Sequence, residues 1–115
     1  MLKEIIVINS TQTGLLESSF TGNMVVDAAF DARLAKHLKQ RLNNSDVAVR
    51  TGDVDDLEQP QDRLFVVSNR VATVINLKAN DHVILYADMD GVVNKGIDAL
   101  AKRVNSYVVK NTLFN

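Results

Sequence analysis

Four consecutive branched apolar residues, Ile5-Ile6-Val7-Ile8, stand near the start of this chain. Successive side chains of a strand point to opposite faces of its sheet, so a run with no polar break predicts a strand that is buried on both faces. Strands of this kind occur mainly in parallel sheets that carry helices on both faces. We therefore predict an α/β fold with this strand, residues 4–9, at its centre.

The rest of the chain alternates strand patterns and helix patterns. Short apolar runs predict further strands at 47–50 and 82–86. Apolar residues at helical spacing predict three helices, over residues 25–42, 61–78 and 93–109. This βαβαβα order predicts one three-layer domain over residues 1–115, with a small parallel sheet, right-handed crossovers and strand order 2-1-3.

Composition narrows the functional classes. Hydrophobic residues make up 46% of the chain, which is typical of a globular protein, and the formal net charge of −1 gives no reason to expect a nucleic-acid or membrane partner. The absence of cysteine excludes disulfides and thiol nucleophiles. Because we also find no signal-peptide pattern and no apolar run long enough to span a membrane, we expect a cytoplasmic protein.

The loop after the first strand lies where open α/β sheets bind ligands, outside the carboxyl ends of the strands. It presents hydroxyls and amides, and its ligand-binding candidates are Ser10, Thr11, Gln12 and Thr13. Backbone N–H groups of such a loop can hold a small anion. The aromatic candidates for lining a pocket beside it are Phe20 and Tyr86.

Asp88-Met89-Asp90-Gly91 follows the last predicted strand and resembles the nucleophile motif of haloacid-dehalogenase-type phosphotransferases. In that chemistry the first Asp attacks phosphorus and the second acts as acid and base. The chain has no room for the partner strands of that family. The alternative is a strand-to-helix turn in which Asp90 or Asn94 caps the last helix.

Two other groups of titratable residues have structural interpretations. The acidic cluster is predicted to be an exposed loop and comprises Asp53, Asp55, Asp56 and Glu58. His37 and His82 have no partners in the sequence that indicate metal binding or nucleophile activation, so we assign both to structural roles.

Four stretches of the chain follow the order of a known family's motifs: Val7–Gly14, Arg50–Asp53, Gln61–Asn69 and Asp81–Asp88. Over about residues 3–90 they resemble the zinc-dependent N-acetylmuramoyl-L-alanine amidases of bacterial cell-wall turnover. The corresponding motifs of that family are Asp-Pro-Gly-His-Gly-Gly, Thr-Arg-Asp, Leu-x-x-Arg with Ala-Asn, and Ser-Ile-His-Ala-Asn. The resemblance implies an amidase-like α/β fold.

The zinc ligands of that family are not retained. The resemblance places Gln12 at the first zinc-binding His, Asp27 at the zinc-binding Glu and Ala87 near the second His. The family's catalytic Glu lies on a later strand for which this chain has no residues. Zinc hydrolysis needs three protein ligands and a base, so the resemblance implies a shortened relative without catalysis.

We therefore expect a non-catalytic binding or assembly module, with no catalytic residue, no metal ligand and no cofactor assigned. Because a small sheet exposes both of its edges, we expect a homo-oligomer that self-associates through sheet edges or helices. The alternative is a metal-dependent hydrolase, amidase-like or a phosphohydrolase, with carboxylates at the strand ends. Its candidates are Asp27, Asp88 and Asp90, which with Gln12 would suit Mg²⁺ or Mn²⁺.

Overall fold

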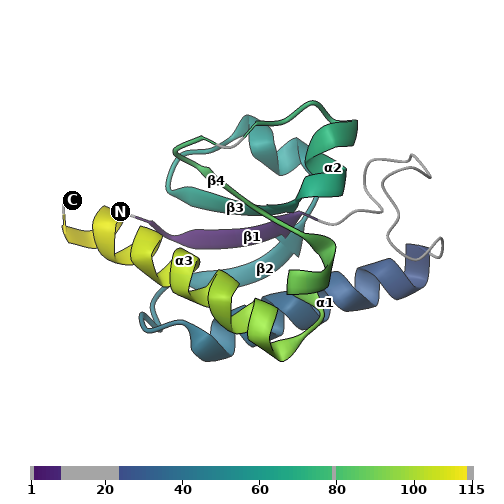
Figure 1. The fold of residues 1–115 in the computed structure, drawn as a ribbon. Coiled ribbons are helices and arrows are strands. Elements are labelled where there is room, and N and C mark those ends of the chain that lie inside the picture. Colours follow the sequence, from purple (N-terminus) through teal and green to yellow (C-terminus); the bar gives the residue numbers. More distant parts are fainter. Residues whose placement is uncertain (1, 9–23, 79, 114–115) are drawn as a thin grey trace.

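Four parallel strands form one sheet in the order β2-β1-β3-β4 (Figure 1). The computed structural model describes residues 2–8, 24–78 and 80–113. The strands are β1 (Glu4–Ile8), β2 (Ala48–Gly52), β3 (Arg63–Ser68) and β4 (Val83–Tyr86). The helices are α1 (Met24–Arg41), α2 (Asn69–Val74) and α3 (Asn94–Leu113), with the short 3₁₀ turns η3 (Val54–Glu58) and η4 (Asp88–Gly91). None of these helices has the length and apolar character needed to cross a bilayer.

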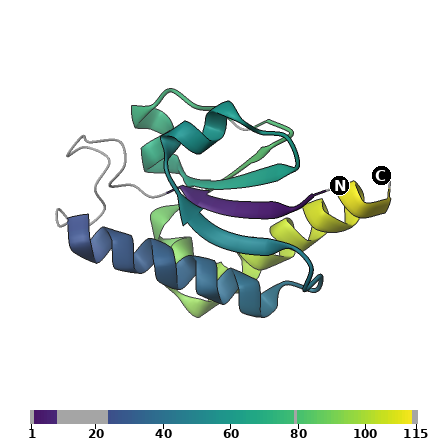
Figure 2. The same cartoon turned by 180° about the vertical axis from the view of Figure 1, so that it is seen from behind.

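The sheet is the middle of three layers (Figures 1 and 2). From β1, Ile5 and Val7 pack with α1 and α3 on one face, while Ile6 and Ile8 pack beneath η3 and α2 on the other. All four side chains are at most 1% exposed. The α/β class, the parallel sheet and the central position of the first strand are therefore confirmed.

The prediction of one helix over residues 61–78 is wrong. Residues 63–68 form β3, and only the short α2 follows it. Leu64 and Val67 have helical spacing with Val71, but the unbroken apolar run between them also suits a strand buried on both faces. Ser68 ends that strand and begins α2, since its Oγ accepts the Val71 N–H at 3.1 Å.

The additional strand changes the predicted neighbours. The strand predicted at 82–86 is β4, and it pairs with β3 rather than lying directly beside β1. The predicted order 2-1-3 thus becomes 2-1-3-4. β2 and β4 are the two edges of the sheet.

A network of four charged side chains ties β1, β2, β3 and η3 together. Arg50 Nε lies 2.7 Å from a Glu4 oxygen and Arg50 Nη2 lies 3.2 Å from an Asp56 oxygen. Arg63 contacts the same two carboxylates at 3.4 and 3.5 Å. The hydrogen bond from Arg50 is the main reason why the pKa values of both carboxyls lie below their ordinary range. The predicted acidic loop is thus the folded η3, which Asp53 caps.

Cationic side chains cover carbonyls at both edges of the sheet. Ala48 N–H donates to Lys3 O, so the carbonyls of Val47 and Thr51 point away from β1. Val47 O accepts from Lys39 Nζ at 2.7 Å, and Thr51 O from Arg50 Nη1 at 3.2 Å. At the other edge, Leu85 O accepts from Arg103 Nη1 at 2.8 Å. Such cover disfavours pairing with a further strand.

If Arg103 protects the edge strand β4, Arg103→Ala should promote self-association of the protein. The substitution removes the donor to the Leu85 carbonyl and uncovers that part of the apolar strand β4. We expect the average molecular mass in sedimentation velocity to rise more steeply with protein concentration than for the parent. Lys102→Ala, which removes an exposed charge at the preceding position of α3, is the control. The same concentration dependence for parent and Arg103→Ala would contradict this role.

The ion network predicts how stability changes in acid. The Glu4 carboxyl has a folded-state pKa below its ordinary value of 4.5, so its contribution is present above that pH and is lost as the pH falls. Glu4→Gln should lower the free energy of unfolding by about 1 kcal/mol at pH 7, and the difference should vanish toward pH 3. Urea unfolding across this range measures it, with the exposed Glu58→Gln as control. A difference that does not change with pH would contradict the assignment.

Candidate functional site

A small hollow opens at the carboxyl ends of β3 and β4, against α1. Its polar lining consists of Asp27, Asp31, Arg70, Tyr86 and Asp88. The remaining lining residues are Phe30, Leu34, Gly91 and Val92. The hollow leaves about 20 Å³ for the centres of water-sized groups, which is room for about one such group.

α1 supplies two buried carboxylates to the hollow. Asp27 and Asp31 are four positions apart, so they lie on the same face of the helix one turn from each other. Asp27 is 2% exposed and Asp31 is 8% exposed. Acidic residues are rarely buried to this extent. Two of them on adjacent turns of one helix face make this face of α1 a candidate for ligand binding.

The ends of β3 and β4 supply an ion pair. Arg70 follows Ser68, the last residue of β3, and Asp88 follows Tyr86, the last residue of β4. Arg70 donates from Nε and from Nη2 to the two oxygens of Asp88, each at 3.2 Å. Two parallel hydrogen bonds of this kind hold both groups in one orientation, so the pair is a rigid wall of the hollow.

Tyr86 lies beneath the carboxylates. Burial raises the pKa of its phenol above the ordinary range, and the nearby charges of Asp31 and Asp88 raise it further, while Arg70 opposes them. Gly91 makes room for the ring, because a Cβ at this position would lie 2.9 Å from Tyr86 Cε2. The phenol therefore stays protonated at neutral pH and can donate a hydrogen bond.

The structure brings together three of the predicted site residues. Asp27, Tyr86 and Asp88 line the same hollow. Asp90 is exposed on η4 and is not among the lining residues. The stretch from Asp88 to Gly91 forms the predicted strand-to-helix turn as η4. The predicted loop candidates Ser10, Thr11, Gln12 and Thr13, together with Phe20, lie outside the described residues.

Sequence reasoning missed Asp31 and Arg70. The spacing of Asp27 and Asp31 on an otherwise amphipathic helix was the signal for the first. Arg70 carried no signal, because its place at the end of a strand depends on β3, which was predicted as a helix.

The hollow carries a surplus of negative charge. Three carboxylates face one guanidinium among its lining residues. Residues 9–23, which connect β1 to α1, contain Glu17 and no Lys, Arg or His. Within the described part of the chain, no three His, Cys, Asp or Glu side chains are grouped so that they could hold a metal ion. The three carboxylates and one guanidinium of the lining favour a positively charged group in the hollow.

Tyr86 predicts a loss of stability in alkali. Its folded-state pKa lies above the ordinary 10.0, so above pH 10 the unfolded chain ionises first and stability falls as the pH rises. The slope from this one group is at most about 1.4 kcal/mol per pH unit. Denaturant unfolding from pH 8 upward should show a shallower fall for Tyr86→Phe than for the parent. Tyr107→Phe, at a less buried phenol, should change the slope less. Equal slopes for parent and Tyr86→Phe would rule out this role.

Comparisons with known proteins do not assign this chain to a family, because no family model, no curated protein and no solved structure matches it. The resemblance to the amidases stays a prediction.

Proposed function

We propose that this chain is a non-catalytic binding module and that its ligand is an organic cation. The ligand's ammonium or guanidinium group would occupy the hollow at the carboxyl edge of the sheet. The observation that carries this proposal is the charge of the lining: three carboxylates, two of them buried on α1, against the single guanidinium of Arg70. A positive group in the hollow would be attracted by the net negative charge of these lining residues.

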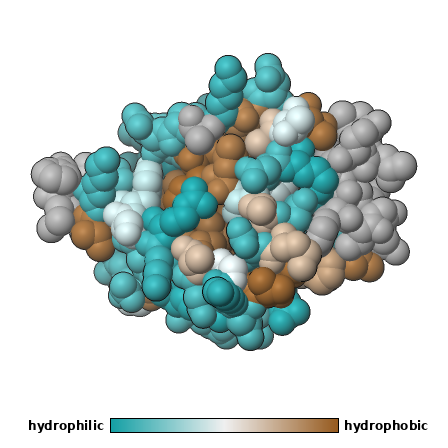
Figure 3. All heavy atoms as spheres, viewed as in Figure 1, coloured by the Kyte–Doolittle hydropathy of each residue, from teal (hydrophilic) through white to brown (hydrophobic). Residues whose placement is uncertain are grey.

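The size and walls of the hollow favour one end of an elongated ligand. Space for about one water-sized group fits an ammonium head, and the aromatic side chains of Phe30 and Tyr86 line it. Outside, Met89 and Val93 are 58% and 42% exposed, where brown and beige residues gather over η4 in the lower right of Figure 3. An apolar stem beside the cation, as in a lysine side chain of a partner protein, suits this surround.

Three further parts of the proposal concern the origin, the location and the self-association of the chain. An amidase-like origin would explain a ligand site at this edge of the sheet, with Asp27 in the place of a zinc-binding Glu. The cysteine-free composition agrees with a cytoplasmic location. For self-association, the cationic cover on Val47, Thr51 and Leu85 favours helices over sheet edges as the contact surface.

The proposal predicts a charge-dependent interaction with a simple probe. Nα-acetyl-lysine methylamide should bind and shift backbone amide resonances around η4 in NMR titrations, while the uncharged norleucine analogue should not. Asp27→Asn should weaken binding at least about tenfold, because a hydrogen bond to a charged group contributes about 1.5–3 kcal/mol and about 1.4 kcal/mol is a factor of ten. Asp90→Asn removes an exposed charge from η4 outside the hollow and should change binding less than twofold.

Two results would overturn the proposal. Equal shifts with both probes would show that charge is not recognised, and equal weakening by Asp27→Asn and Asp90→Asn would place the interaction elsewhere. A parallel titration with MgCl₂ or MnCl₂ addresses the metal-dependent hydrolase, which the shared position of Asp27 and Asp88 favours. Saturable metal binding that both Asp27→Asn and Asp88→Asn abolish would support that function instead.

A further inference from the structure

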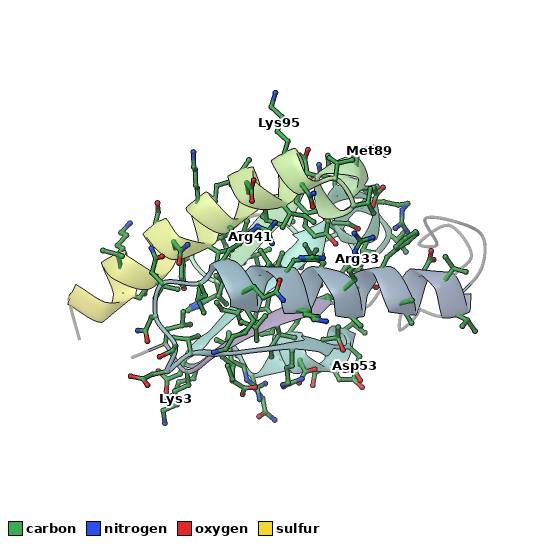
Figure 4. The ribbon with its side chains drawn as sticks, turned by 90° about the horizontal axis from the view of Figure 1, so that it is seen from below. Lys3, Arg33, Arg41, Asp53, Met89 and Lys95 are labelled. Atoms are coloured by element: carbon green, nitrogen blue, oxygen red, sulfur yellow. The ribbon has the colours of Figure 1, made fainter. Side chains whose placement is uncertain are left out.

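A row of basic side chains lies on the outer layer, away from the hollow. Arg33, His37 and Arg41 are each four positions apart on α1. Arg41 Nε donates to Asp98 of α3 at 2.6 Å, so the row runs along the seam between the two long helices. Figure 4 shows Arg33 and Arg41 on the side of α1 that faces α3.

The imidazole of His37 is held between the two guanidinium groups. Arg33 Nε lies 3.2 Å from His37 Nε2, and Arg41 Nη1 lies 3.2 Å from His37 Nδ1. Arg41 Nη1 also donates to the carbonyl oxygen of His37 at 3.2 Å. Both ring nitrogens therefore face N–H donors.

This arrangement has more donors than acceptors. A neutral imidazole offers one N–H and one acceptor nitrogen, and guanidinium offers donors only. In either tautomer of the neutral ring, one of the two ring nitrogens carries a hydrogen. The N–H of that nitrogen therefore faces an N–H of an arginine, and no hydrogen bond can form there. Asp98 and the His37 carbonyl are the acceptors that the row contacts, and both are used by Arg41. An additional acceptor at the seam would resolve the conflict.

We infer that the α1–α3 seam is a binding site for an oxyanion of the phosphate class. A tetrahedral oxyanion carries several acceptors and a negative charge, and the planar fork of arginine matches its geometry. It would accept from the Arg33 guanidinium and from His37 Nε2, in place of the present 3.2 Å contact between those two groups, while Arg41 stays anchored to Asp98. This site is separate from the hollow and does not depend on the proposed function.

The two histidines of the chain provide a built-in test. His37 lies in the seam, whereas His82 directly precedes β4, at the opposite end of that strand from η4. Inorganic phosphate is titrated into the intact chain at constant pH and ionic strength, and the carbon-bound imidazole protons are followed by NMR. We expect saturable shifts of the His37 signals and none of the His82 signals. A second titration with phenyl phosphate distinguishes a free phosphate site from one that takes phosphomonoesters.

Matched variants separate the site from general electrostatics. Arg33→Ala should weaken phosphate binding about threefold to fivefold, as expected for one exposed charge pair. Lys36→Ala removes the same charge from an exposed position of α1 outside the row and should change it less than twofold. Non-saturable shifts, equal shifts of both histidines, or equal effects of the two substitutions would overturn the inference. Thermal unfolding of each variant checks that the fold is retained.

Discussion

The burial of β1 on both faces is the constraint on which the rest of the structure depends. Its four branched side chains remove apolar surface from water only if each face of the sheet is covered. α1 and α3 cover one face, and η3 with α2 covers the other. The ion network at the start of the strands then ties η3 to the sheet through Arg50 and Arg63. Because the sheet is parallel, the carboxyl ends of all its strands lie on one side of the molecule, and the hollow lies there.

The sequence was sufficient for the elements whose apolar period has one interpretation. The unbroken run of β1 and the long amphipathic repeat of α3 each fit a single kind of element. Residues 63–68 fit two, because Leu64, Val67 and Val71 have helical spacing within a run that is also continuous. These residues form a strand because they pair with β1 on the side away from β2. A local sequence pattern does not contain that information.

The contrast between local pattern and strand pairing also applies to the site residues. Those marked by a local feature of the sequence could be predicted, and the one that depends on strand pairing could not. Asp88 could be predicted from its position directly after an apolar strand, whereas Asp27 was predicted from the resemblance to the amidases. Asp31 follows from Asp27 by one helical turn. Arg70 requires knowing that β3 ends at Ser68, so the pair that forms one wall of the hollow emerges only with the fourth strand.

The start of β1 and the end of α3 lie side by side, at the opposite end of the molecule from the hollow (Figures 1 and 2). A short linker could therefore connect the end of α3 to the start of β1. A new break between Pro60 and Gln61, both exposed and outside every helix and strand, would leave each described element whole. In such a circular permutant β3 would be synthesised before β1. The order in which the strands meet during folding would change, while the contacts of the finished sheet would not.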